Sequence, residues 1–259
     1  MNVIIITGAS SGMGMEFAKQ MDRCFCTVDE FWLIARSRDR LERLAKELKH
    51  KARVFAMDIT DKNSMDRLEK ELQERKAVVR ILINCAGYGI MGPFDKLDRT
   101  QTLGMVRLNC EALTDMTYRI LPFMRKNSRI IQLASSAAFM PQPDFAVYAA
   151  SKAYVHSFSQ AIGTELKERG IYVTSVCPGP VDTPFFDIAE KDGTTLAVKK
   201  MTMVQPEKVV ALALRDSYYK RPISVCSLPI KVFHAAAKAV PHGMLLKGIS
   251  ILKSLSILK

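Results

Sequence analysis

Near its N-terminus the sequence reads VIIITGASSGMG (residues 3–14). The apolar run Val3–Ile6 is continuous, which is typical of a strand buried on both faces, and a helical pattern begins at Met15. Glycines at such a point let the backbone turn tightly and approach a pyrophosphate, which a helix N-terminus binds. The spacing G-x-x-x-G-x-G differs from the G-x-G-x-x-G fingerprint and by itself is also typical of a plain turn. Its position between strand and helix favours a pyrophosphate site, formed by Gly8, Ser10, Ser11, Gly12, Met13 and Gly14.

Beyond this turn, short apolar runs alternate with longer amphipathic stretches. The runs predict strands at Val3–Ile6, Phe31–Ala35, Val54–Met57, Ile81–Asn84, Ile130–Ala134 and Val173–Cys177, with a late strand at Ile223–Cys226. The helical patterns cover Ser37–Leu48, Lys62–Arg75, Leu103–Met124 and Ala146–Arg169. This alternation predicts an α/β protein with a Rossmann-type, doubly wound parallel β-sheet flanked by helices on both faces. No linker rich in proline, glycine or serine divides the chain, so we expect residues 1–259 to form one domain.

The composition excludes several classes of protein. Of the 259 residues 48% are apolar and 25% charged, which argues against disorder and against a small disulfide-stapled fold. The net charge of +12 attracts anions, but the basic residues are dispersed without a nucleic-acid-binding motif, so we expect no nucleic-acid partner. The six cysteines form no C-x-x-C pair, and we predict no metal site.

The apolar runs are far shorter than the ~20 residues of a membrane span. The opening residues do not resemble a secretory leader, so we predict a cytoplasmic protein.

The end of the second predicted strand, LIARSR (residues 33–38), indicates which dinucleotide binds. An acidic side chain there accepts a hydrogen bond from the ribose 2′-OH of NAD, whereas an arginine accommodates the extra phosphate of NADP. Ala35 stands in the place of the acid and Arg36 follows it, and a guanidinium suits a phosphate. The alternative is that Arg36 and Arg38 are solvated residues at the start of a helix. We predict NADP(H) in preference to NAD(H).

Tyr148 and Lys152 stand four residues apart in a predicted helix and hence on one face of it. An unperturbed tyrosine has a pKa of about 10, too high for efficient proton exchange near neutral pH. An ammonium ~4 Å away, at an effective dielectric constant of ~20, contributes about 4 kcal/mol or roughly three pKa units, which would bring the pKa of the phenol to about 7 if nothing opposed it. Tyr148 is therefore the predicted catalytic acid/base, although an ordinary surface Tyr–Lys pair has the same spacing.

Other polar residues follow the predicted strands. Ser135 comes directly after Ile130–Ala134, where its hydroxyl is placed to hold a substrate oxygen. Asn109 lies inside a helical stretch, where an amide can disrupt the hydrogen-bond ladder and hold a water. The segments NCAG (84–87) and PGPVDT (178–183) follow two more strands, at the carboxyl edge where α/β sheets bind ligands. We expect all of them to meet at one site.

Together, these motifs resemble in order and spacing the single-domain branch of the short-chain dehydrogenase/reductase superfamily, from Val3 to about Thr183. The resemblance implies that Tyr148 is the general acid/base and that Lys152 lowers its pKa and binds the ribose hydroxyls. It also implies that Ser135 orients the substrate and that Asn109 belongs to a proton relay. Asp58 resembles the acid that contacts adenine, while Val181 and Thr183 resemble contacts to the nicotinamide half. The cofactor contacts that the resemblance implies beyond the glycine turn are Arg36, Asp58, Ile59, Asn84, Ala86, Gly87, Tyr148, Lys152, Pro178, Gly179, Val181 and Thr183.

The sequence departs from the family pattern at two places. NCAG replaces the commoner NNAG, so Cys85 stands where an amide usually braces the central sheet. The glycine turn carries Ser10 and Ser11 without the basic residue that many NADP-using members place there, which leaves Arg36 with most of the NADP prediction.

The resemblance also implies that residues 184–205 form a lid over the substrate. Apolar side chains occur in this lid and in the segments after NCAG and Ser135: Phe185, Phe186, Met201, Met203, Ile90, Met91, Phe139, Met140 and Pro141. Each is equally typical of core packing, but together they favour a hydrophobic ketone or secondary alcohol as the substrate, of the steroid, bile-acid or acyl type.

Residues 231–259 lie outside the part of the chain that carries the resemblance. From Leu245 to Leu258, apolar residues recur at spacings of three and four, with lysine and serine between them. We expect this amphipathic extension to pack on the body of the protein or in a dimer, with peripheral contact to an anionic membrane as the alternative. We also expect a homodimer or homotetramer.

The sequence favours an NADP(H)-dependent oxidoreductase over two alternatives. A nucleotide-sugar epimerase or dehydratase uses the same Tyr/Lys pair but generally needs a larger substrate domain than 259 residues permit. A non-catalytic, redox-sensing dinucleotide-binding regulator has no need of Ser135, Asn109, Tyr148 and Lys152 together.

Overall fold

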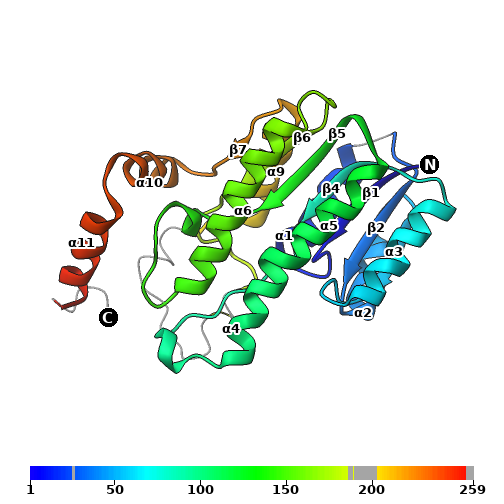
Figure 1. Ribbon diagram of the computed structural model, residues 1–259. Coiled ribbons are helices and arrows are strands. Elements are labelled where there is room, and N and C mark those ends of the chain that lie inside the picture. The colour runs from blue at the N-terminus through cyan, green and yellow to red at the C-terminus, as the bar shows by residue number, and fades with distance from the viewer. Residues whose placement is uncertain (25–26, 186–188, 190–202, 255–259) are drawn as a thin grey trace.

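Short runs rich in valine and isoleucine form strands because their branched side chains pack well on a pleated surface. The computed structural model describes residues 1–24, 27–185, 189 and 203–254. In that part of the chain, seven parallel strands form one sheet in the order β3-β2-β1-β4-β5-β6-β7 (Figure 1). The strands are β1 (Asn2–Thr7), β2 (Glu30–Ala35), β3 (Ala52–Ala56), β4 (Val78–Asn84), β5 (Met124–Leu133), β6 (Tyr172–Val176) and β7 (Ile223–Ser224).

Helices cover both faces of this sheet (Figure 1). The α-helices of the described residues are α1 (Gly12–Cys24), α2 (Arg38–Glu47), α3 (Lys62–Glu74), α4 (Arg99–Val106), α5 (Leu113–Ile120), α6 (Ala146–Glu165), α9 (Pro206–Tyr218), α10 (Leu228–Ala239) and α11 (His242–Ser254). The shorter segments are η1 (Phe94–Lys96), the π-helical η2 (Arg107–Ala112), η3 (Leu121–Phe123) and η4 (Ser136–Phe139). The predicted Rossmann-type, doubly wound α/β fold is confirmed.

Strand β1 lies inside the sheet, between β2 and β4, and points its side chains alternately into two cores. Ile4 and Ile6 belong to the core under α1, α2 and α9, whereas Val3 and Ile5 belong to the core under α3, α5 and α6. All four side chains have no exposed surface. Burial on both faces is the reason that the run is continuous instead of alternating.

The predicted helix Leu103–Met124 is wrong in its continuity. Helix α4 passes into the π-helical η2, then into α5 and η3, and Met124 already begins β5. The wide turn contains Asn109, whose amide bonds to the backbone of Tyr88: Nδ2 donates to the carbonyl oxygen at 2.9 Å, and Oδ1 accepts from the N–H at 3.1 Å. The disrupted ladder that the sequence predicts at Asn109 is therefore present. Such a bulge re-aims one side chain without ending the helix.

The C-terminal extension, defined here as α10 and α11, leaves the body of the protein at the end of the sheet. Strand β7 stops at Ser224, two residues before the predicted end, because the chain then turns into α10. Helix α10 packs against η4, whereas α11 projects away from the sheet (Figure 1). Among the described residues, no helix combines the length and the apolar character needed to cross a bilayer.

Candidate active site

Loops that follow the strands enclose a cleft of about 1680 Å³. Because every strand is parallel to its neighbours, the carboxyl ends share one edge of the sheet, which is where such sheets bind ligands. Residues after β1, β2, β4, β5 and β6 all contribute to its wall, among them Gly8, Arg36, Ala86, Ser135 and Gly179. Segments that are distant in sequence are thus brought to a single site.

The turn between β1 and α1 has a shape that requires glycine. Gly8 and Gly12 have φ angles of +68° and +52°, in the left-handed region that side chains disfavour. A Cβ on Gly8 would lie 2.8 Å from the backbone nitrogen of Ala86, and one on Gly14 would lie 2.2 Å from the carbonyl oxygen of Gly8. The turn therefore packs directly against the segment after β4. The whole predicted set of turn residues lines the cleft: Gly8, Ser10, Ser11, Gly12, Met13 and Gly14.

Thr7 joins the ends of β1 and β4, a role that sequence reasoning missed. Its Oγ1 accepts hydrogen bonds from the N–H groups of Cys85 (3.0 Å) and Ala86 (3.1 Å) and lies 3.4 Å from the carbonyl oxygen of Ile83. The side chain is buried. The hydroxyl braces the central strands beside the position where Cys85 replaces an amide. The signal for this role in the sequence was a polar residue, Thr7, at the end of an apolar strand.

Two arginines lie in the wall of the cleft beyond β2. Arg36 and Arg40 both line it, four residues apart, and neither guanidinium makes a hydrogen bond or ion pair with another residue of the described part of the chain. Arg38, in contrast, does not line the cleft and lies 3.5 Å from a carboxylate oxygen of Glu42. Arg40 was missed by sequence reasoning, although its position in the first turn of α2, shortly after Arg36, was the signal for it. The pair leaves two positive charges available to an anion.

Asp58 and Ile59 line the same part of the cleft, after β3. The Oδ1 atom of Asp58 accepts hydrogen bonds from the N–H (2.9 Å) and the hydroxyl (2.7 Å) of Thr60. This local turn fixes the carboxylate, which leaves its second oxygen for a ligand. Ile59 is buried beneath it.

Two of the predicted residues lie behind the cleft instead of in its wall. Asn84 is the last residue of β4 and does not line the cleft: its side chain is buried, and its Nδ2 donates to Thr117 Oγ1 of α5 at 3.0 Å, so its contact with the cofactor stays a prediction. Asn109 has no exposed surface, and its Nδ2 also donates to Ser151 Oγ at 3.0 Å. With its bonds to Tyr88, this amide holds the chain after NCAG against α6.

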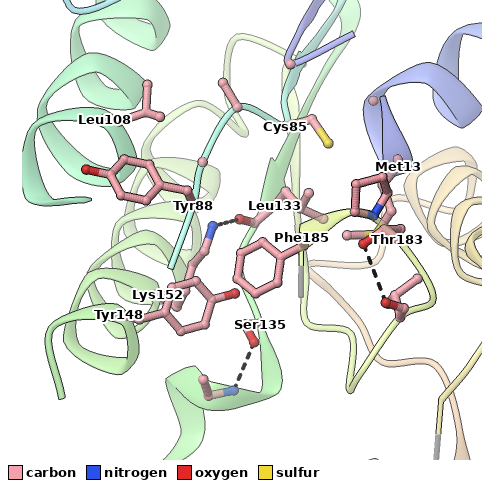
Figure 2. A pocket seen from close by; sticks show the side chains of 18 of the residues that line it. Met13, Cys85, Tyr88, Leu108, Leu133, Ser135, Tyr148, Lys152, Thr183 and Phe185 are labelled. Atoms are coloured by element: carbon pink, nitrogen blue, oxygen red, sulfur yellow. Dashed lines mark hydrogen bonds between the residues drawn. The ribbon is translucent and has the colours of Figure 1, made fainter. Parts of the chain in front are cut away.

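Tyr148, Lys152 and Ser135 lie together in one wall of the cleft (Figure 2). The Lys152 ammonium is 5.7 Å from the centre of the Tyr148 ring, one helical turn away on α6. It donates a 2.7 Å hydrogen bond to the carbonyl oxygen of Leu133 at the end of β5. Ser135 follows that strand, and its Oγ accepts from the N–H of Ala137 at 3.1 Å. The arrangement places a phenol, an ammonium and a hydroxyl around one point.

Burial opposes the lowering of the Tyr148 pKa that a nearby ammonium was expected to cause. Burial raises the pKa of Tyr148 to about 12, and hydrogen bonding to Ser135 opposes that rise. Burial also lowers the pKa of Lys152 to about 8. Both effects have one cause: removal from water disfavours the charged form of each group. The phenol is 7% exposed and the ammonium bonds to a carbonyl, so the attraction on which the prediction relied does not dominate.

An apolar wall surrounds the phenol. Phe145 stacks on Tyr148 with ring centres 4.2 Å apart. The ring centre of Phe185 lies 5.4 Å from that of Tyr148 (Figure 2). Met91 and Met140 line the cleft as predicted, and Phe145 and Phe233 were missed by sequence reasoning. Ile90, Phe139 and Pro141 do not line it, because the chain turns them away from the cleft. The cleft near the phenol therefore suits an apolar group.

The turn after β6 forms the opposite wall. Pro178, Gly179, Val181 and Thr183 all line the cleft. A Cβ on Gly12 would lie 3.4 Å from Thr183, so this turn lies against the glycine turn. Of the predicted lid 184–205, Pro184 and Phe185 line the cleft, and Val204 forms a bridge with Val181. Residues 186–188 and 190–202, with Phe186 and Met201, lie outside the described residues, and the lid stays a prediction.

Known proteins match this chain over most of its length. A protein-family model for the short chain dehydrogenase matches residues 2–193. Sulfoacetaldehyde reductase 2 of Chromohalobacter salexigens is 32% identical over 241 residues, which are 88% of this chain and 93% of that protein. A very-long-chain 3-oxoacyl-CoA reductase of Neurospora crassa is 35% identical over 181 residues, which are 65% of this chain and 53% of that protein. The structure of a short-chain dehydrogenase from Sphingobium yanoikuyae in complex with NADPH has a TM-score of 0.79 at 26% identity and covers 95% of each chain.

Proposed function

The chain belongs to the short-chain dehydrogenase family and is an oxidoreductase that acts on CH–OH and keto groups with NAD(P). We propose that it is specific for NADP(H) and for a hydrophobic ketone or secondary alcohol. The observation that carries the proposal is the meeting of Tyr148, Ser135 and Lys152 in the cleft that the glycine turn also lines. The glycine turn and the arginines after β2 line one half of the cleft, and aromatic side chains around the Tyr148 phenol line the other half.

The residues in the first half fit a phosphorylated dinucleotide. The glycine turn presents backbone and the N-terminus of α1 to the cleft, which suits a pyrophosphate. Arg36 and Arg40 carry charges that no other described residue neutralises, and they suit the 2′-phosphate that distinguishes NADP from NAD. Family likeness assigns Asp58 to the adenine, Lys152 to the ribose, and Val181 and Thr183 to the nicotinamide. Adenine, ribose and nicotinamide are common to NAD and NADP, so the proposed preference for NADP(H) is supported by Arg36 and Arg40 alone.

The residues in the second half supply the proton chemistry. When bound, the nicotinamide supplies the hydride that adds to the carbonyl carbon of the ketone. Tyr148 donates its phenolic proton to the carbonyl oxygen, which becomes the alcohol, and Ser135 donates a hydrogen bond to the same oxygen. The Lys152 ammonium stabilises the phenolate that remains. Burial raises the pKa of Tyr148 to about 12, so the phenol is protonated near neutral pH, and a pKa of about 8 leaves most of the Lys152 side chains charged, which are the forms that this step uses.

The substrate class follows from the wall around the phenol. Phe145 and Phe185 flank Tyr148, and Met91 and Met140 extend the apolar surface. Aromatic and methionine side chains bind apolar groups and exclude water from the reacting atoms. A bulky ketone of the steroid, bile-acid or acyl type therefore fits better than a small charged aldehyde.

Substitution of the phenol tests the proposal. We expect Tyr148→Phe to lower the rate of NADPH-dependent reduction of a panel of steroid, bile-acid and acyl ketones by about 10²- to 10⁴-fold, the usual contribution of general acid catalysis. The affinity for NADPH, measured by calorimetry, is unchanged because the ring remains. Tyr154→Phe is the matched control, since this tyrosine lies on the same helix with its hydroxyl 2.8 Å from Thr114. Retention of turnover by Tyr148→Phe would exclude the assigned chemistry.

A further inference from the structure

Helix α10 carries apolar side chains on both of its sides. Its inner side packs on the body: Ile230 lies against Gly179, and Phe233 lies 6.2 Å from Phe139 between ring centres. Its outer side is apolar as well, since Leu228 and Val232, one helical turn apart, are 72% and 61% exposed. A helix on the surface of a water-exposed protein normally presents a polar outer face. The outer face of α10 therefore suits a second, apolar environment.

The charge of this part of the chain is of one sign. Between Ser217 and Lys259 there are seven lysine or arginine residues and no aspartate or glutamate. Lys231 and Lys238 are exposed, lie seven residues apart on one side of α10, and flank the apolar outer face. Neither forms an ion pair with another described residue. A basic border beside an apolar stripe is typical of a helix that lies in the interface of an anionic membrane.

Helix α11 stands away from the body of the protein (Figure 1). A Cβ added to Gly243 or to Gly248 would have no heavy atom within 4 Å. Met244 is 64% exposed on the same helix, and Lys247 lies beside it. The open side of α11 continues the combination of apolar and basic side chains found on α10.

We propose that the C-terminal extension binds the surface of an anionic membrane, with the outer face of α10 in the interface and its lysines at the headgroups. Charge complementarity favours this occupant, because the extension carries four lysines, Lys231, Lys238, Lys247 and Lys253, and no aspartate or glutamate, and these cations attract acidic lipid headgroups. A second copy of the chain is disfavoured: a twofold-symmetric contact through this segment would place the same basic residues against one another. The binding is peripheral and does not depend on catalysis.

The position of α10 connects this membrane contact with the cleft. Phe233, on the inner side of α10, lines the cleft, while Leu228 and Val232 on the outer side face away from the body. One helix thus separates the cleft from the proposed membrane contact. If the proposed function holds, an apolar ketone dissolved in the bilayer has a short route to the phenol, a consequence that rests on that function, whereas the membrane contact itself does not.

Vesicle flotation tests the contact. We expect the full-length protein to float with vesicles that contain phosphatidylglycerol in phosphatidylcholine, to bind pure phosphatidylcholine at least tenfold more weakly, and to be released by high salt. Leu228→Glu with Val232→Glu removes the apolar stripe and abolishes binding. Lys231→Gln with Lys238→Gln lowers the partition coefficient roughly 25-fold, about fivefold for each lysine.

Matched controls lie elsewhere on the surface. Lys46→Gln with Lys49→Gln removes two exposed lysines around the end of α2, and Tyr118→Glu alters a tyrosine of α5 that is 78% exposed. Both controls keep wild-type flotation. NADPH affinity of each variant, measured by calorimetry, verifies the fold, since none of the changed residues lines the cleft.

Three results would overturn the proposal. The first is a wild-type protein that stays with the aqueous fraction at low salt, and the second is equal flotation of wild type and the Leu228/Val232 variant. The third is a halved mass in size-exclusion chromatography for that variant, which would show that a second copy covers α10. A loss of catalysis with intact flotation would instead count against the proposed function alone.

Discussion

Gly87 has no side chain and so lets two polar side chains of the site approach the backbone after β4 closely. A Cβ there would lie 2.9 Å from Oδ1 of Asn109 and 3.4 Å from Nζ of Lys152. Both polar atoms therefore approach the backbone after β4 more closely than a larger residue permits. The amide fixes the loop, and the ammonium stays beside it while bonded to Leu133. A substitution at this position would displace the lysine from the phenol.

The two neighbouring arginines after β2 make the cofactor preference testable. We expect Arg36→Ala to lower kcat/KM for NADPH by about 10- to 100-fold, because charge-assisted hydrogen bonds contribute about 1.5–3 kcal/mol. The value for NADH stays unchanged, since NADH lacks the phosphate. Steady-state kinetics with both dinucleotides measure this. Arg38→Ala is the control, as Arg38 lies outside the cleft and beside Glu42. An equal loss with both dinucleotides would show that Arg36 does not read the phosphate.

The sequence predicts which residues lie together in the site, but not how burial and hydrogen bonding change their pKa values. Helical spacing places Tyr148 and Lys152 on the same face of their helix. Because Ser135 follows a buried strand, it lies at the carboxyl edge of the sheet, where the site forms. The pKa values depend instead on burial and on the carbonyl of Leu133, nineteen positions before Lys152, which no local pattern reveals. The hydrogen bond from Asn84 to Thr117 could not be predicted for a similar reason, because it depends on how α5 packs.

At the scale of elements, α6, strand β6 and α10 meet at two histidines. The Nδ1 atom of His156 lies 2.9 Å from Ser175 Oγ, and its ring centre is 6.2 Å from that of His234 on α10. His234 stacks on Phe139 with ring centres 4.1 Å apart. Burial, His234 and Lys238 lower the pKa of His156 to about 4. The attachment of α10 to the body thus contains a neutral imidazole.

This packing predicts acid sensitivity. In the unfolded chain His156 has an ordinary pKa near 6.5, so between pH 6.5 and about 4 the unfolded state binds a proton that the folded state does not. Folding stability therefore falls as the pH falls through this window, by up to about 1.4 kcal/mol per pH unit for this group. We expect the Tm of His156→Gln to depend less on pH there than that of the wild type, as measured by thermal unfolding. His242→Gln, at an exposed histidine of α11, keeps the wild-type slope, and identical slopes for all three proteins would contradict the assignment.

Element boundaries could be predicted wherever hydrophobic periodicity ends abruptly. Most strands appear within about three residues of their predicted ranges because their apolar runs are bounded by polar turns, whereas β5 begins at Met124 instead of Ile130, since its first half is polar. The region from Leu103 to Met124 could not be divided in advance, since its apolar pattern continues through the π-helical turn. Only the amide of Asn109 marked that place, and the partner of that amide, Tyr88, lies in a loop.

At the scale of the whole molecule, the cleft forms only when the strands have assembled into the complete sheet. Its walls come from residues between Gly8 and Phe233, and no single segment contains both the arginines and the phenol. The strand order places the two halves side by side, with β1 and β4 as neighbours at the centre. A ligand that spans both halves therefore binds the folded chain and not the unfolded one.

This arrangement predicts strong stabilisation by the cofactor. At a concentration 100 times its Kd, NADPH adds about 2.7 kcal/mol to folding stability. For a chain of this size each kcal/mol corresponds to about 2–4 °C, so we expect a rise in Tm of roughly 5–10 °C. Differential scanning fluorimetry measures this, with NADH at the same concentration giving a smaller rise. A rise of equal size with both dinucleotides would contradict the NADP(H) preference.

The central place of β1 also affects how the chain acquires its shape during synthesis on the ribosome. This first strand needs β2 on one side and β4 on the other, and the latter ends only at Asn84. One edge of β1 thus remains uncovered while about a third of the protein is being translated. Contacts between such distant segments form slowly, and an uncovered apolar edge invites association with other nascent chains. The topology that joins the two halves of the cleft therefore leaves this apolar edge unpaired until β4 has been made.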